Sequence, residues 1–190
     1  MRGRRTDRRQ IIICIVAVCF LIGIAVGALS QRSLDANQTE RLAVYADAVK
    51  CDNTGFTEVF FKHGKYIIAI WLCGFIYSGT AAVLIIIFTA GLFYGFSASY
   101  AAAGRGMGYV LSELFVPNML FVPLYIFTAV WTISYILRRF SNCGPKSRIR
   151  RERRKHLSEH IVVLACCMAA NALGCISEMY AAGFLNGIFK

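Results

Sequence analysis

The sequence predicts an all-α fold, a polytopic membrane bundle of about five transmembrane helices. Three observations lead to this prediction: an apolar composition, long runs without charge, and arginine clusters beside those runs. Of the 190 residues, 57% are hydrophobic and only 16% are charged, whereas a soluble domain carries about a quarter charged residues. Because one helical crossing needs roughly 20 apolar residues, the chain is long enough for several crossings.

Two basic segments orient the predicted spans. Residues 1–10 hold five arginines and residues 138–155 hold nine lysines and arginines, together 14 of the 21 in the chain. Residues 30–65 carry five basic and five acidic side chains and are balanced. Since basic clusters beside spans mark the cytoplasmic side, we expect a cytoplasmic N-terminus, and contacts of the basic segments with anionic lipid headgroups. Nucleic-acid binding is disfavoured, because the second basic segment lies between two apolar runs.

The span boundaries follow from the apolar runs and the breaks between them. The first run, 11–29, is uncharged and longer than the roughly 7–15-residue core of a signal peptide, so it is interpreted as an anchored helix. Between the balanced segment and the second basic segment the chain must cross an odd number of times, and its length suits three helices. The predicted order is a cytoplasmic N-terminus 1–10, a span 11–29, an extracytoplasmic loop 30–56, spans 57–77, 80–102 and 107–137, a cytoplasmic loop 138–159, a span 160–182 and an outer tail 183–190.

A stripe of small residues marks one face of the span 80–102. Gly91 and Gly95 form a GxxxG pair, and Ser99 and Ala103 continue it at the same spacing. Small residues four apart let helices approach closely where lipid provides no hydrophobic drive. The stripe therefore predicts a helix–helix contact, and the pattern leaves open whether the partner helix belongs to the same chain or to a second copy.

The stretch ELFVPNMLFVP interrupts the predicted span 107–137. Pro117 and Pro123 each remove a backbone donor, and a disrupted helix at membrane depth requires protein groups or water to satisfy the freed carbonyls. Asn118 can do so with its amide. We expect a helix that is kinked or broken at 117–123 and buried against its neighbours. A hinge, a docking groove, part of a permeation path and a plain kinked packing element all fit this pattern.

Two acids lie within apolar segments, Glu113 and Glu178. An ionisable residue at membrane depth is a functional candidate by default. Both also lie toward the predicted outer face, where pairing with Arg105 or with a backbone donor gives a simpler interpretation.

Sequence motifs for catalysis or for a bound cofactor are not found. The chain has no P-loop, no Gly-x-Ser-x-Gly and no HExxH, and its cysteines and histidines lack metal-ligand spacing. Six of the eight cysteines fall in apolar runs; Cys51 is expected outside and Cys143 inside, so these two cannot pair. His63 is expected to be an interfacial side chain. We predict no catalytic residue, no metal and no cofactor, and hence a protein that is not an enzyme.

Three runs resemble the stage II sporulation protein M family: FTEVFFKHGKYIIAIWLCGFIYSG, IIIFTAGLFYGFSASY and GRGMGYVLSELFVPNMLFVPLYIF. The family carries a Pro-x-Asn motif with a second proline five residues after the asparagine. Asn118 and Pro123 match this motif. The first proline departs from it, because Pro117 stands next to the asparagine and Val116 occupies the usual proline position.

Further positions extend the resemblance. Gly91, Gly95 and Gly106 match family glycines, and Ser99 replaces a further one. The run ISEMYAAGF resembles the family's glutamate-containing pattern, with Glu178 at the glutamate, although the proline that usually follows is absent.

The resemblance implies a membrane scaffold in endospore formation. Family members sit in the mother-cell septal membrane and are expected to recruit two peptidoglycan-degrading partners, stage II sporulation proteins D and P, during septal thinning and engulfment. The alternative is a small transporter or channel component, with Glu113, Asn118 and Glu178 lining a polar path, since broken helices also occur in transporters. Association with a second copy of the chain stays open.

Overall fold

The computed structural model describes residues 3–33, 56–76, 78–105, 116–141 and 157–177. These residues form five helices and the turns beside them, and no strand occurs in these ranges. The helices are α1 (Gly3–Arg32), α3 (Phe56–Cys73), α4 (Gly79–Arg105), α6 (Val116–Ser141) and a fifth helix, Leu157–Ser177. The predicted all-α bundle is therefore confirmed.

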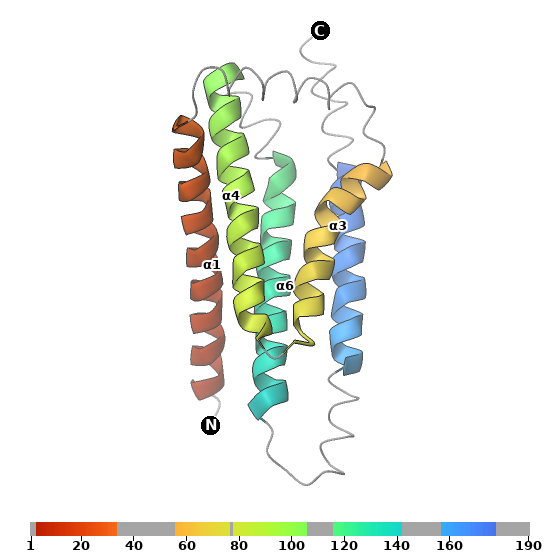
Figure 1. Cartoon of the computed structure of the whole chain (residues 1–190). Coiled ribbons are helices and arrows are strands. Elements are labelled where there is room, and N and C mark those ends of the chain that lie inside the picture. The colour runs from red at the N-terminus through yellow and green to blue at the C-terminus, as the bar shows by residue number, and fades with distance from the viewer. Residues whose placement is uncertain (1–2, 34–55, 77, 106–115, 142–156, 178–190) are drawn as a thin grey trace.

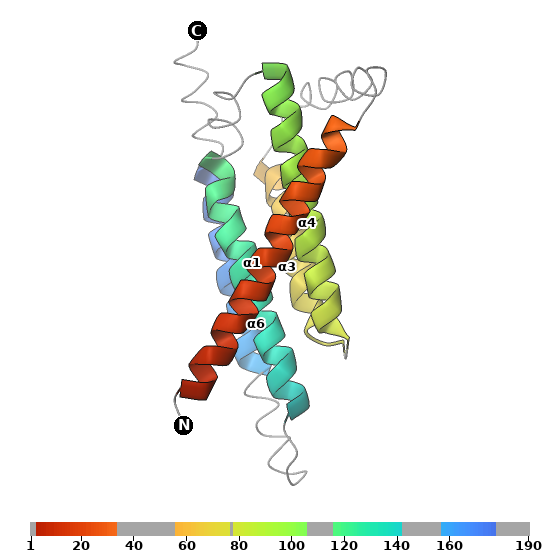
Figure 2. The same cartoon turned by 90° about the vertical axis from the view of Figure 1, so that its left-hand side faces the viewer.

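The helices run alternately up and down the long axis of the bundle (Figure 1). α1 rises from the end where it begins, α3 descends, α4 rises, α6 descends, and the fifth helix, drawn in blue, rises again. Figure 2 shows α1 crossing the bundle obliquely, in front of α4 and α6. The start of α1 and the end of α6 consequently lie at the same end, which we call the basic end because it carries Arg9, Arg138 and Arg139.

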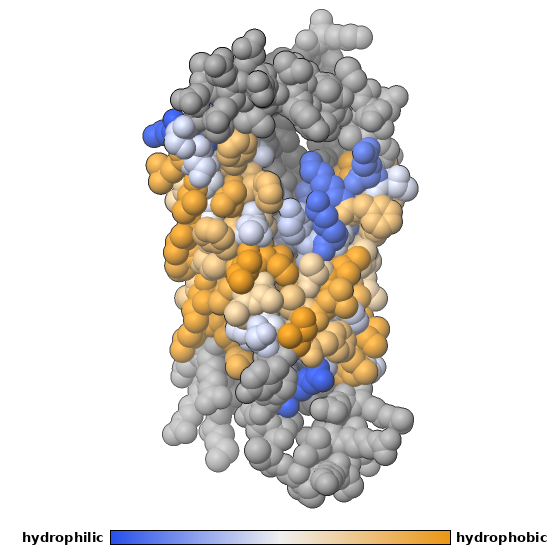
Figure 3. Space-filling model, viewed as in Figure 1, coloured by the Kyte–Doolittle hydropathy of each residue, from blue (hydrophilic) through white to orange (hydrophobic). Residues whose placement is uncertain are grey.

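Four of the described helices are long and apolar enough to cross a membrane. The four candidate spans are Arg9–Arg32, Gly79–Ala103, Leu120–Arg139 and Leu157–Ser177. α3 is not among them, because its 18 residues include Glu58, Lys62 and Lys65. A crossing by 57–77 therefore stays a prediction. Figure 3 shows hydrophobic side chains around the middle of the bundle and hydrophilic ones toward its ends, as a membrane protein requires.

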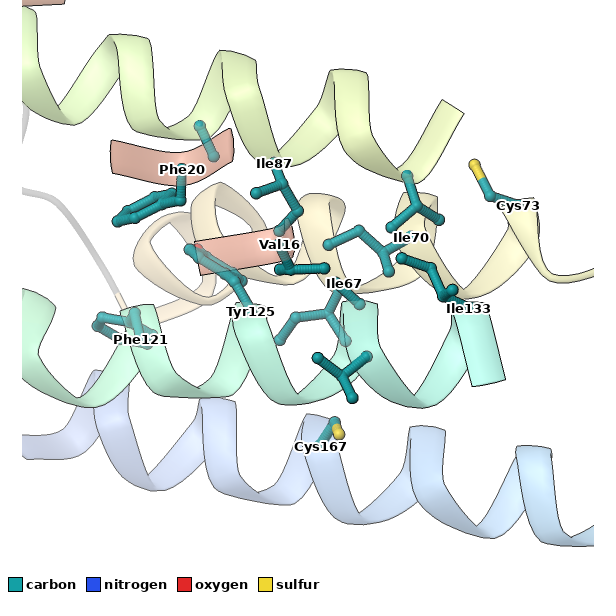
Figure 4. Packing of buried hydrophobic residues seen from close by; sticks show 14 of the residues in the cluster. Val16, Phe20, Ile67, Ile70, Cys73, Ile87, Phe121, Tyr125, Ile133 and Cys167 are labelled. Atoms are coloured by element: carbon teal, nitrogen blue, oxygen red, sulfur yellow. The ribbon is translucent and has the colours of Figure 1, made fainter. Parts of the chain in front are cut away.

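The buried core lies around α6, which is the central helix. Half of its spanning window is buried inside the bundle, compared with 22% for the window in α1 and 28% for those in α4 and the fifth helix. Figure 4 shows side chains from all five helices pointing toward one another, among them Val16 of α1, Ile67 of α3, Ile87 of α4, Tyr125 of α6 and Cys167 of the fifth helix. The side chains of α6 therefore form the part of the core that the other four helices pack against.

The helix ends differ from the sequence-based spans at two places that matter for the site. α6 runs from Val116 to Ser141, so it begins only one residue before Pro117 and continues past the predicted limit of 137. The fifth helix begins at Leu157, three residues earlier than predicted, and is described as far as Ser177. The remainder of the predicted span 160–182 lies outside the described residues.

Candidate functional site

Glycines bring α1 and α4 into backbone contact. Gly91 and Gly95 of α4 face the carbonyl oxygens of Phe20 and Ile24 on α1 so closely that neither position has room for a Cβ atom. Gly23 and Gly27 of α1 lie in the same way against backbone atoms of α4. Each helix therefore presents a GxxxG pair to the other, the arrangement that allows close packing in lipid.

A polar contact continues the crossing between α1 and α4 beyond the glycines. The Ser99 hydroxyl donates a hydrogen bond of 2.9 Å to the side-chain oxygen of Gln31 on α1. The predicted stripe of Gly91, Gly95 and Ser99 therefore has its partner within the same chain. The complementary pair, Gly23 and Gly27, has the same four-residue spacing but was not singled out in the sequence, where it lies in an otherwise uniform apolar run.

A buried polar cluster joins α3, α6 and the fifth helix in the half of the bundle away from the basic end. The His63 ring stacks on Phe121 with 3.8 Å between ring centroids, and its Nδ1 lies 2.8 Å from the Tyr125 hydroxyl. Asn171 of the fifth helix donates a hydrogen bond of 3.2 Å to the carbonyl of Phe60. His63 is 6% exposed and Asn171 fully buried, so the expectation of an interfacial His63 is wrong: Phe121 and Tyr125 enclose its ring.

A second histidine cluster lies nearer the basic end. His160 of the fifth helix stacks on Tyr135 of α6, with 4.1 Å between ring centroids, and on Trp71 of α3, with 5.3 Å. The Trp71 indole donates a hydrogen bond of 3.0 Å to the His160 carbonyl. A Cβ atom added at Gly74 would lie 2.7 Å from His160 Nε2, so this glycine makes room for the ring. The cluster fastens the end of α3 to the fifth helix and to α6.

Comparison with known families decides what kind of bundle this is. A family model for stage II sporulation protein M matches residues 16–189, nearly the whole chain. The chain belongs to the stage II sporulation protein M family. No curated protein and no solved structure matches it. Family membership makes this a sporulation-related membrane protein, and the resemblance stated from the sequence is confirmed.

The family motif around Asn118 lies at the start of α6. Pro117 is the second residue of this helix, where the missing N–H has no intrahelical partner to lose. Pro123 lies inside the helix with its side chain exposed; it removes the bond to the carbonyl four residues earlier, and its ring crowds that carbonyl. α6 continues through both prolines, so a break at 117–123 is not found in the helix as described. The side chains of Pro117 and Asn118 are not among those described.

Three further candidate residues lie outside the described part of the chain: Gly106, Glu113 and Glu178. Gly106 and Glu113 fall between α4 and α6, and Glu178 directly follows the fifth helix. The structure therefore packs Gly91 and Gly95 against α1. The roles expected of Glu113 and Glu178 stay predictions.

Several polar side chains in the bundle join one helix to another. Among the described residues, no group of three or more His, Cys, Asp or Glu is placed to hold a metal ion. None of the six described cysteines is in a disulfide bond, and the Thr128 hydroxyl lies 3.5 Å from the sulfur of Cys167 on the fifth helix. His63, Tyr125 and Asn171 make bonds between different helices, which is the contribution expected of polar side chains in a membrane interior.

Proposed function

We propose that this protein is a non-catalytic membrane scaffold that recruits peptidoglycan-degrading partners during septal thinning and engulfment in endospore formation. The observation that carries the proposal is the family match over residues 16–189. By the resemblance, the partners are stage II sporulation proteins D and P, and the membrane is that of the mother cell at the septum. Polar groups that bond helices to one another suit a scaffold, because they fix the shape of a partner-binding surface.

The proposed orientation places the basic end in the cytoplasm. Arg9 begins the first candidate span and Arg139 ends the third, and arginine beside a span favours the cytoplasmic side. With this orientation and the alternation of the helices (Figure 1), we expect the start of α3 and the end of α4 to lie outside. Partners that cut the cell wall work on that outer side, so the outer half of α3 is one of the described segments placed to meet them.

The outer half of α3 carries exposed side chains suited to protein binding. Phe61, an aromatic residue, is 66% exposed. Lys62, the next residue, is also exposed. The opposite face of the same segment is held in the bundle by His63 and Gly64. An aromatic side chain beside a charge, on a helix fixed from behind, is a suitable anchor for a partner.

A matched pair of substitutions on α3 tests the proposal. Phe61→Ala removes the exposed ring at the outer end, while Leu72→Ala removes an exposed apolar side chain, 51% exposed, near the other end of the same helix. With affinity-tagged protein in detergent, Phe61→Ala is expected to lower co-purification of the two partners several-fold, and Leu72→Ala to leave it unchanged. Equal recovery from both variants would contradict a partner surface at this place.

A second pair of variants addresses the family-motif residues. Asn118→Ala and Glu178→Gln are each expected to reduce partner recovery while the protein remains folded, as judged by far-UV circular dichroism. Full recovery from both would remove these residues from the partner-binding surface without affecting the family assignment.

A transporter or channel component is the second candidate function. Its supporting observation is that buried polar side chains follow one another along α6 and its neighbours: Asn171, Tyr125, Thr128, Thr132 and His160. Ion flux through proteoliposomes that contain the purified protein, lowered by Thr132→Val, would favour this function. Liposomes that remain tight, combined with normal partner binding, would favour the scaffold.

A further inference from the structure

A small pocket opens at the basic end between three helices. It has a volume of about 50 Å³ and is lined by Arg9 of α1, by Trp131, Ser134, Tyr135 and Arg138 of α6, and by Glu159 of the fifth helix. Figure 2 shows the lower ends of α1 and α6 diverging, with the fifth helix behind them. Sites for drug-sized ligands measure roughly 300–1,000 Å³, so this pocket suits one small group rather than a whole metabolite.

The pocket lies at the level where the apolar spans end. Arg9 is the first residue of the candidate span Arg9–Arg32, and Arg138 is the second-to-last residue of the candidate span Leu120–Arg139. Trp131 lies seven residues before Arg138, or roughly 10 Å deeper along the helix. Lipid headgroups occupy the level of Arg9 and Arg138, and tryptophan is enriched at the membrane interface, next to the apolar region.

The lining favours a group with a single negative charge. Two guanidinium groups and one carboxylate line the pocket, which leaves a formal charge of +1. Glu159 has an interaction of its own, whereas neither Arg9 nor Arg138 has an ion-pair partner among the described residues. Arginine binds phosphate oxygens through paired, charge-assisted hydrogen bonds, so the guanidinium groups of Arg9 and Arg138 match one phosphodiester.

The wall on α6 is held in place before any ligand arrives. Ser134 donates its hydroxyl proton to the carbonyl of Val130 at 2.7 Å. The ring of Tyr135 is buried and stacked on His160. The ring of Trp131 stacks on Phe127 at 6.3 Å between centroids. A wall fixed in this way loses little conformational freedom on binding.

We propose that this pocket binds the phosphate group of an anionic membrane phospholipid, held between Arg9 and Arg138. A lipid is the occupant because the pocket borders apolar side chains that face outward. Ile13 lies one helical turn from Arg9 and is 42% exposed, and Phe127 lies one turn from Trp131 and is 48% exposed. Acyl chains can lie along these side chains while the phosphate enters the pocket, whereas a soluble phosphate would gain nothing from them.

Native mass spectrometry of the full chain in detergent tests the proposal. Phosphatidylglycerol and phosphatidylcholine are titrated against the wild-type protein, against Arg9→Gln/Arg138→Gln, and against Arg32→Gln. Arg32 is an exposed arginine at the opposite end of the same span and serves as the matched control. The double variant is expected to bind phosphatidylglycerol about tenfold or more weakly, since it loses two charge-assisted contacts. Arg32→Gln is expected to bind it as the wild type does.

The remaining outcomes distinguish a phospholipid from soluble phosphate as the occupant of the pocket. Equal binding of the two lipids by the wild type, or equal phosphatidylglycerol binding by the double variant and Arg32→Gln, overturns the proposal. Displacement of the lipid by millimolar inorganic phosphate overturns it in favour of a soluble anion site. Arg138→Gln alone is expected to weaken binding; if the double variant does not fold, unchanged phosphatidylglycerol binding by Arg138→Gln refutes the site.

Discussion

Adding one methyl group to Gly95 is expected to destabilise the bundle measurably. A Cβ atom at this position would lie 2.8 Å from the Cα of Ile24 and 2.7 Å from its carbonyl carbon. Ordinary van der Waals contact begins at 3.4 Å, so α1 would have to move away by about 0.6 Å or more, a distance at which overpacking typically costs roughly 1–3 kcal/mol. The obstacle is backbone, so no side chain can rotate out of the way.

Helix propensity acts in the opposite direction and sets the net size of the effect. Replacing glycine by alanine inside a helix stabilises the helix by up to about 1 kcal/mol. By these figures the net loss is roughly 0–2 kcal/mol. Because the obstacle is backbone on α1, we expect Gly95→Ala to lie in the upper part of this range and to lower the free energy of unfolding by about 1–2 kcal/mol. The measurement is reversible unfolding in mixed detergent micelles with increasing SDS, followed by far-UV circular dichroism.

Gly64→Ala is the matched control for Gly95→Ala. It is also a helical glycine, but its added Cβ would lie 3.5 Å from Asn171 Nδ2 and 3.6 Å from Met168 Cε, which is ordinary contact. This variant is expected to be as stable as the wild type or slightly more stable, because it gains helix propensity without a clash. If Gly95→Ala is also as stable as the wild type, the close crossing of α1 and α4 is refuted.

Three further predictions follow from the buried polar contacts and from the proposed orientation. Tyr125→Phe removes the hydroxyl that bonds His63 and is expected to lower the free energy of unfolding by about 0.6–1.7 kcal/mol; an unchanged value would contradict the bond. Asn171→Leu should change stability by less than about 1 kcal/mol, since it removes both one hydrogen bond and a buried amide oxygen that has no hydrogen-bond partner in the described structure; a loss above about 3 kcal/mol would show that the amide is fully satisfied. In intact cells, a membrane-impermeant maleimide is expected to label Cys51 and to leave Cys143 unlabelled, and the reverse result would overturn the orientation.

Hydropathy was sufficient to predict the helices, because the membrane imposes one local requirement on every span. α4, which runs from Gly79 to Arg105, is a helix over the residues of the predicted span 80–102, and its crossing of a membrane stays a prediction. The prolines were harder to interpret from the sequence. Their effect depends on where the helix begins, and a start at Val116 makes Pro117 harmless. A pattern of residue types does not fix that starting position to within one residue.

The contacts between helices were predictable only in part. The four-residue spacing of Gly91 and Gly95 indicated a packing face, but not that α1 would occupy it. His63 illustrates the limit more clearly: its burial depends on Phe121 and Tyr125, about 60 residues away in the sequence. A single sequence holds no signal that pairs a lone histidine on one apolar helix with an aromatic residue on another.

The glycine contact between α1 and α4 has a consequence for biogenesis. During synthesis α1 emerges from the ribosome first, while its partner glycines follow only after α3 has been made. The interval from Gly23 to Gly91 corresponds to several seconds of translation at roughly 5–20 residues per second. The first span must therefore remain in the bilayer without its partner during that time. The uncharged apolar surface of the run 11–29 allows this, because lipid can solvate it until α4 is inserted.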